Sequence, residues 1–410
     1  MKKNFGFSFI LLITLGILSC ASGHSPKQGE QGQNRTFEKG KVISSVTCLK
    51  DHSTTYSLYL PTKYSSSQTF PVILAFDPHG SGNLPLELYH ELAEKYGYIF
   101  IGSNDSKNGN SISETNRIIS SLFEEINGRF SIDTNRVYAM GFSGGARIAS
   151  IIGLFRGGIA GVIGCGAGFP GTDQPGNFRF DYIGFAGTSD FNMNELIRLD
   201  EQLDHLEFNH ALFLFDGIHE WPSKSLMEKA FVWNECCAMR RKFIPRNENF
   251  IQREKHVFDS TLNIEKASED KISYHRDLKN AISFMKDLFE TVSYQRFLSD
   301  LENDLEYKRQ LKAQQNLMEK ESQEQQALTD DFFFKDIAWW KSKMKEYDKR
   351  ISGKNNLTDA RMCKRMKSYL SLMSYINYNR MLNSGDMEKA NFALQVYQVV
   401  DPENAAKIKK

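Results

Sequence analysis

Residues 136–150 read Arg136-Val137-Tyr138-Ala139-Met140-Gly141-Phe142-Ser143-Gly144-Gly145-Ala146-Arg147-Ile148-Ala149-Ser150. The apolar run before Gly141 predicts a strand and the segment after Gly145 a helix, with the pattern Gly-x-Ser-x-Gly between them. A sharp turn of this kind lifts the serine hydroxyl clear of the backbone, and only glycines fit where strand and helix crowd it. The stretch therefore predicts an exposed, nucleophilic serine, Ser143, at the end of a buried strand.

Strands and helices alternate on both sides of this turn, up to about residue 240. The apolar runs predict strands over 42–49, 56–60, 71–76, 98–102, 159–163, 182–185 and 211–215, of which the first two are expected to be antiparallel. Helical spacing is found over 85–96, 113–130, 193–206 and 224–233, with Ser113 as the expected cap of the second of these helices. This alternation predicts an α/β fold, a mostly parallel sheet covered by helices on both faces.

A serine needs a base and an orienting acid before it reacts at neutral pH. Asp190 follows the strand 182–185 and so lies on the carboxyl-end side of the sheet, where sites form in such folds. We therefore expect Asp190 to be the acid, although an aspartate here could also only cap the next helix. Asp216, after the following strand, is the alternative acid, whereas Asp181 precedes its strand and lies at the wrong edge.

The expected base is His219, in the short loop Asp216-Gly217-Ile218-His219-Glu220-Trp221-Pro222 after the strand 211–215. Acid and base then follow the serine in the order that this kind of turn requires. Pro222 is expected to start the next helix. His205 and His210 are expected at the opposite edge of the sheet, and the alternative for His219 is a surface-loop histidine without function.

The oxyanion of the reaction needs backbone donors close to the serine. One is expected from the N–H of Gly144, directly after Ser143. The second is expected from Gly80 or Ser81, in the loop Asp77-Pro78-His79-Gly80-Ser81-Gly82-Asn83 after the strand 71–76. We interpret His79 as a residue that shapes this loop and not as a second base.

These motifs together resemble the α/β-hydrolase superfamily, in particular its bacterial esterases related to polyhydroxyalkanoate depolymerases, feruloyl esterases and dienelactone hydrolases. The resemblance covers about residues 40–240 and rests on His79-Gly80, Gly141–Gly145, Gly187-Thr188-Ser189-Asp190 and Gly217–Pro222. It implies a Ser-His-Asp acyl-enzyme mechanism on small esters or acylated glycans, with neither cofactor nor metal. The chain departs from these relatives at Asp77-Pro78, where an aliphatic residue often precedes His-Gly, and this leaves the substrate class open.

The N-terminus is predicted to lie outside the fold. Lys2 and Lys3 precede an apolar run that ends in Ile17-Leu18-Ser19-Cys20, which is typical of a secretory signal and resembles the lipobox of bacterial lipoproteins. The resemblance implies cleavage after residue 19, lipid on Cys20 and an exported protein attached to a membrane. A plain signal peptide or a single anchor helix is the alternative. Residues 20–38 are predicted to be a flexible tether to the hydrolase domain, 39–240.

Residues 241–410 are predicted to form a helical domain because glycine and proline are rare there and charged helical patterns are long. Residues 309–328 are polar enough to form a solvated connecting helix, and residues 383–404 resemble half of a tetratricopeptide repeat. A protein partner for this domain is therefore possible. Lys and Arg total 51 against 50 for Asp and Glu, a balance that gives no indication of nucleic-acid binding.

Serine hydrolysis of an ester is the function that these observations favour. A serine peptidase of the same fold and an inactive surface scaffold that binds a partner through its helices are the alternatives. The five cysteines after Cys20 show no metal-like or disulfide-like spacing and are expected to be buried thiols.

Overall fold

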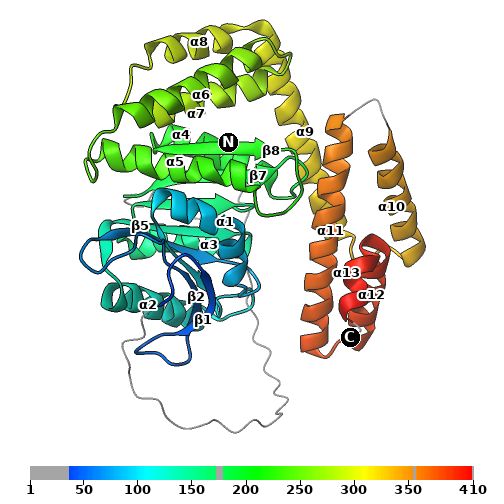
Figure 1. Cartoon of the computed structure of the whole chain (residues 1–410). Coiled ribbons are helices and arrows are strands. Elements are labelled where there is room, and N and C mark those ends of the chain that lie inside the picture. The colour runs from blue at the N-terminus through cyan, green and yellow to red at the C-terminus, as the bar shows by residue number, and fades with distance from the viewer. Residues whose placement is uncertain (1–36, 172–178, 354–356, 409–410) are drawn as a thin grey trace, which may run out of the picture.

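The computed structural model describes residues 37–171, 179–353 and 357–408 (Figure 1). The predicted leader, Cys20 and most of the tether lie outside the described residues. In the described part, Cys48, Cys165, Cys236, Cys237 and Cys363 are buried free thiols, as expected. No helix among the described residues combines the length and the apolar composition that a membrane crossing requires.

An eight-stranded sheet forms the centre of the first part of the chain, in the order β1-β2-β4-β3-β5-β6-β7-β8. The pairs β1–β2 and β2–β4 are antiparallel and all other pairs are parallel. The predicted fold class, an α/β-hydrolase fold followed by helices, is thereby confirmed. The strands are β1 Val42–Thr47, β2 Thr55–Tyr59, β3 Phe70–Phe76, β4 Ile99–Ser103, β5 Ile132–Phe142, β6 Gly161–Cys165, β7 Asp181–Gly187 and β8 His210–Phe215.

The apolar sequence of the central strands explains why helices cover both faces of the sheet. Every residue of β3 and β7 is buried, as expected for parallel strands enclosed on two sides. Helices α1 and α5 contribute to the core on one face, and α2, α3 and part of α4 contribute to the core on the other. These helices are α1 Asn83–Tyr96, α2 Ile112–Arg129, α3 Gly144–Ile151, α4 Met193–His205 and α5 Lys224–Arg240.

Two predicted helix starts were wrong by one or two residues. The cap of α2 is Ser111 and not Ser113, because the Ser111 side chain accepts a hydrogen bond from the N–H of Glu114. Pro222 does not start α5, because Ser223 is the capping residue and its hydroxyl accepts from Leu226. In both places a second serine stands two residues away, and the extended backbone of Ser111 and Ser223 (ψ 161° and 156°) lets these two residues act as caps.

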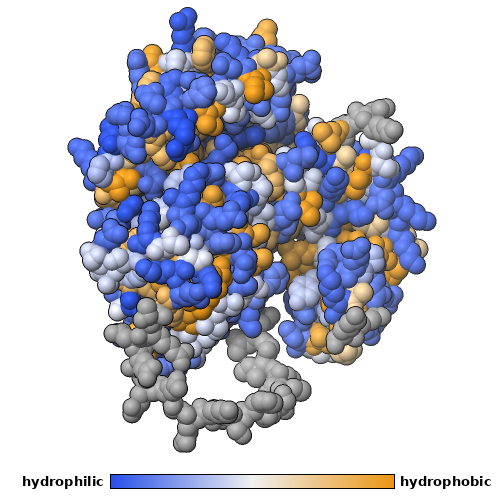
Figure 2. Space-filling model, viewed as in Figure 1, coloured by the Kyte–Doolittle hydropathy of each residue, from blue (hydrophilic) through white to orange (hydrophobic). Residues whose placement is uncertain are grey.

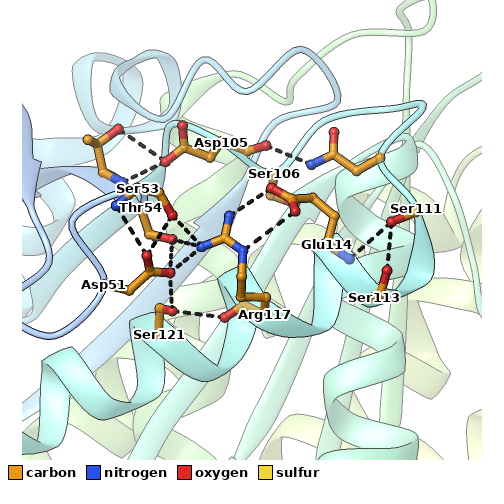
Figure 3. A network of polar contacts seen from close by, with 12 residues as sticks. Asp51, Ser53, Thr54, Asp105, Ser106, Ser111, Ser113, Glu114, Arg117 and Ser121 are labelled. Carbon is orange, nitrogen blue, oxygen red and sulfur yellow. Dashed lines mark hydrogen bonds and ion pairs between the residues drawn. The ribbon is translucent and has the colours of Figure 1, made fainter. Parts of the chain in front are cut away.

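A polar network attaches the β1–β2 hairpin to α2 (Figure 3). Asp51, in the hairpin, accepts hydrogen bonds from the hydroxyls of Ser53, Thr54 and Ser121 and pairs with Arg117 of α2. These hydroxyls hold the pKa of Asp51 well below its usual range. The network thereby joins the antiparallel end of the sheet to α2.

Helices α6 (Glu248–Lys266), α7 (Lys271–Met285) and α8 (Val292–Asn303) extend the core beyond the sheet. The side chain of Asn280, on α7, accepts from the N–H of Leu212 at 3.1 Å and donates to its carbonyl at 2.8 Å. One amide therefore satisfies both polar groups of one residue of the edge strand β8. The predicted domain limit at residue 240 falls inside this continuous core, between α5 and α6.

The last helices form a core of their own (Figure 1). Helix α9 (Leu305–Asp330) runs from the α6–α8 group to α10 (Ile337–Ser352), α11 (Leu357–Ser384), α12 (Met387–Val400) and α13 (Pro402–Ile408). It matches the predicted connecting helix, but it is not solvated throughout, because Met318, Glu321 and Leu328 are buried. Figure 2 shows that hydrophilic residues cover most of the visible surface, and that smaller hydrophobic areas lie among them.

Candidate active site

Ser143 stands on the sharp turn between β5 and α3. Its backbone has φ 52° and ψ −120°, a left-handed conformation that few non-glycine residues adopt. The turn is possible because Gly141 and Gly145 lie against neighbouring backbone. A Cβ on Gly141 would stand 2.1 Å from the carbonyl oxygen of Gly145, and one on Gly145 would stand 2.0 Å from that of Phe76. The glycine spacing therefore has the steric cause that the sequence indicated.

The structure brings Ser143, His219 and Asp190 together in one line of hydrogen bonds. Nε2 of His219 lies 2.9 Å from Oγ of Ser143, and Nδ1 lies 2.9 Å from Oδ1 of Asp190. The Asp190 side chain is 1% exposed and that of His219 is 20% exposed. A buried carboxylate, an imidazole and a hydroxyl in this order make a nucleophile that the histidine can deprotonate.

Two aromatic rings and a backbone N–H hold the acid and the base in place. The His219 ring packs against Phe142 and Phe191, with ring centroids 4.6 and 4.4 Å away. The N–H of Asn192 donates to Oδ1 of Asp190 at 2.8 Å, the same oxygen that faces His219. This shared oxygen fixes the carboxylate and, through it, the tautomer of the imidazole.

Gly166 is a site residue that the sequence reasoning missed. It follows β6 with φ +65°, and a Cβ there would stand 3.0 Å from Oδ2 of Asp190 and 3.1 Å from Cε1 of His219. Any larger residue would therefore press on both partners of the acid–base pair. A glycine directly after the carboxyl end of a strand next to the serine strand was the signal that could have found it.

The structure does not support the expectation that the N–H of Gly80 binds the oxyanion. The N–H of Gly80 donates to the carbonyl of Asp77 at 3.1 Å in a tight turn, so this donor is already engaged. The prediction of Gly80 as an oxyanion donor was therefore wrong. The N–H groups of Ser81 and Gly144 have no acceptor among the described residues, and these two candidates are retained.

Asp77 accounts for the unusual Asp-Pro step before His79. Its side chain is buried and accepts from the N–H of His79 at 2.9 Å and from Nε1 of Trp221 at 3.2 Å. Asp77 thereby connects the oxyanion loop to the loop that carries His219. The side chain of His79 is 82% exposed, and within the loop it is the backbone N–H of His79 that bonds Asp77.

Asn108 is a second neighbour that the sequence did not reveal. A Cβ on Gly144 would stand 1.9 Å from Oδ1 of Asn108, so the amide occupies the place that a side chain after Ser143 would take. Asn108 lies in the loop after β4 and is fixed by its own N–H, which donates to the carbonyl of Pro78 at 2.8 Å. The amide therefore lies beside a proposed oxyanion donor.

The alternative acid and the other histidines lie elsewhere. Asp216 is 84% exposed and its carboxylate faces Thr188 and Arg361, not His219. His205 ends α4, and His210 begins β8 at the opposite edge of the sheet. These placements follow from the direction of the parallel strands.

One group of possible metal ligands occurs among the described residues, formed by Asp200, Asp204 and His210. Nζ of Lys279 lies 2.7 Å from Asp200 and also pairs with Asp204. Burial lowers the pKa of His210, but hydrogen bonding and charge from Asp200 outweigh it, so the pKa is raised overall. The cluster already contains an ammonium as its counter-charge, and we assign it no metal.

Comparison with known proteins gives structural similarity only. No family model and no curated protein matches the chain. S-formylglutathione hydrolase from Staphylococcus aureus is 12% identical over 49% of this chain and 99% of its own, with a TM-score of 0.39. An esterase from Pyrobaculum calidifontis is 9% identical over 49% and 85%, with a TM-score of 0.39. An acylaminoacyl peptidase from Pyrococcus horikoshii is 13% identical over 50% and 42%, with a TM-score of 0.37. At these values the similarity carries no argument about activity.

Proposed function

We propose that the protein is a serine hydrolase that cleaves carboxylic esters through a covalent acyl-enzyme. The observation that carries the proposal is the line of two 2.9 Å hydrogen bonds from Ser143 through His219 to buried Asp190. The strained backbone of Ser143 supports it, because such strain persists where the surrounding structure holds a functional residue in place.

In the first step, Oγ of Ser143 attacks the ester carbonyl carbon while its proton moves to Nε2 of His219. The carboxylate of Asp190 holds the Nδ1–H and stabilises the imidazolium that forms. The N–H groups of Gly144 and Ser81 donate to the oxyanion. His219 then gives its proton to the leaving alkoxide, and an acyl-Ser143 remains.

In the second step, water takes the place of the alcohol. His219 removes a proton from the water, the resulting hydroxide attacks the acyl carbon, and the carboxylic acid leaves as Oγ of Ser143 regains its proton. Small esters or acylated glycans outside the cytoplasm are the substrate class that we propose. This class rests on the leader and the lipobox-like Cys20 in the sequence and on the esterase resemblance of residues 40–240.

Labelling with a fluorophosphonate probe tests the chemistry directly. Ser143→Ala is expected to abolish both labelling and hydrolysis of p-nitrophenyl acetate. Ser225→Ala, which changes an exposed serine on α5, is expected to leave both unchanged. Absence of Ser143-dependent labelling in the wild-type protein would favour the inactive scaffold.

A substrate panel separates the remaining alternatives. Acetyl, feruloyl and longer-chain esters are compared with p-nitroanilides of the same acyl groups. Faster turnover of the anilides would favour the peptidase over the esterase. Faster turnover of the feruloyl ester than of the acetyl ester would indicate a preference for aromatic acyl groups.

A further inference from the structure

One buried arginine connects the C-terminal helices to the loop that carries the acid of the site. Arg365 lies on α11 and its side chain is 4% exposed. Its Nε lies 2.8 Å from Oε1 of Glu321, on α9, and its Nη1 donates to the carbonyl of Thr188 at 2.7 Å. Arg365 and Thr188 are 177 positions apart in the sequence. Thr188 comes two residues before Asp190.

The Thr188 carbonyl belongs to the tight turn that presents Asp190. The N–H of Asp190 donates to the carbonyl of Gly187 at 3.0 Å, so these four residues form a β-turn whose central peptide joins Thr188 and Ser189. The N–H of this peptide donates to the carbonyl of Gly217 at 2.8 Å. Its carbonyl is held from the other side by Arg365. Both polar groups of the central peptide are thus fixed, and the peptide cannot rotate without breaking one of them.

Glu321 balances the charge of Arg365, so the N–H that faces the acid loop is not needed for that purpose. Glu321 is 1% exposed and pairs with the guanidinium through both carboxylate oxygens. A planar guanidinium presents its N–H groups in a fixed fork, so pairing with Glu321 also sets the direction of the third N–H. Lysine has no such fork. The arrangement therefore aims a donor at one carbonyl, in addition to balancing a charge.

A second arginine of α11 contacts the loop that carries the base. Arg361 stands one helical turn before Arg365, and its Nη2 lies 3.0 Å from Oδ1 of Asp216. Asp216 begins the loop of His219. The two loops are also joined to each other, because Thr188 donates its N–H to Phe215 at 2.8 Å. One face of α11 thus contacts the loops of both the acid and the base.

We propose that Arg365 is a positioning residue that fixes the turn of Asp190, so that the C-terminal helices are part of what makes the serine site active. This inference rests on the proposed function. Arg365 acts through the Thr188 carbonyl and makes no contact with the reacting atoms. Through this hydrogen bond, the C-terminal helices hold the turn of Asp190 in place, although they are not part of the sheet.

The test replaces the buried pair without leaving either charge alone. In Arg365→Met/Glu321→Met the charges disappear together, whereas Arg365→Lys keeps a charge opposite Glu321 but loses the fork. Both variants are expected to remain folded by circular dichroism and to lower kcat for p-nitrophenyl acetate roughly 10- to 100-fold, since small misplacements of catalytic groups have effects of this size. KM is expected to stay within about twofold, because α11 is not proposed to contact the substrate.

A spectroscopic readout distinguishes positioning from general weakening. The low-field proton resonance of the His219–Asp190 hydrogen bond is expected to broaden or move in both variants. Arg350→Gln/Asp359→Asn is the matched control, because this ion pair joins the C-terminal helices α10 and α11 to each other. The control is expected to lower the melting temperature without changing kcat or the resonance.

Several results would overturn the inference. One is a kcat within about twofold of wild type in the folded Arg365 variants, and another is an equal fall in kcat in the control. These results are separate from failure of the proposed function. In that case the wild-type protein itself would show no Ser143-dependent hydrolysis.

Discussion

Replacing Asp190 by asparagine tests the acid of the site and gives a magnitude that the structure sets. Oδ1 of Asp190 accepts from both the N–H of Asn192 and Nδ1 of His219. In Asp190→Asn the amide oxygen is expected to take this place, because its NH2 group would lose the Asn192 bond. The imidazole then keeps the tautomer that leaves Nε2 free to accept from Ser143.

The remaining loss is that of the negative charge beside the imidazolium in the transition state. Two unit charges about 4 Å apart at an effective dielectric constant of about 20 interact by about 4 kcal/mol. At 1.36 kcal/mol for each tenfold change, kcat is expected to fall about 10³-fold. This is smaller than the about 10⁴-fold loss that follows when an asparagine imposes the wrong tautomer.

The assay is hydrolysis of p-nitrophenyl acetate at neutral pH, with thermal melting measured alongside. Asp216→Asn is the matched control and is expected to keep kcat within about twofold of wild type, because its carboxylate is 84% exposed and does not contact His219. A fall of less than tenfold for Asp190→Asn would refute the assignment. A large fall for Asp216→Asn that Arg361→Gln does not reproduce would transfer the role of acid to Asp216.

Three further changes have outcomes set by local geometry. Gly166→Ala places a methyl 3.0 Å from Asp190 at φ +65°, so we expect about 1 kcal/mol lower stability by urea unfolding and at least about tenfold lower kcat; unchanged activity would contradict this. In Gly144→Ala the new Cβ would stand 1.9 Å from Oδ1 of Asn108, so kcat is expected to fall. Gly144→Ala/Asn108→Gly removes this clash and is expected to recover kcat; failure to recover would contradict the steric cause. Burial raises the pKa of Asp277 from 3.8 to about 6, so the folded state binds the proton more tightly and loses stability as pH rises between these values. Asp277→Asn is therefore expected to be about 1–3 kcal/mol more stable than wild type at pH 8 and equal to it below about pH 4 in urea unfolding; the opposite trend would refute the sign.

The central sheet and the three groups at Ser143, Asp190 and His219 could be placed from the sequence because local signals determine them. Continuous apolar runs specify buried strands, and the carboxyl ends of parallel strands meet at one edge. Asp190 and His219 each follow such a strand directly. Their approach to Ser143 is therefore a consequence of strand direction, which needs no knowledge of side-chain packing.

The rest of the site depends on contacts that the local pattern does not contain. The use of the Gly80 N–H in a turn depends on the backbone angles of its loop. Gly166 matters only because two distant side chains lie against it. The contact between Arg365 and Thr188 spans 177 positions, and a buried ion pair has no spacing rule along the chain. Residue 240 likewise appeared as a domain limit because composition changes there, although the core continues through it.

The two ends of the sheet have a consequence for self-association. An uncovered edge strand presents unpaired N–H and C=O groups with which a second molecule can pair. At β8, α7 covers the edge, and the amide of Asn280 already bonds both groups of Leu212. At β1, one extra residue between Ile43 and Val46 distorts the strand, and such bulges hinder pairing with a further strand. Both edges thus carry features that hinder strand addition, and these features disfavour edge-to-edge aggregation of the folded chain.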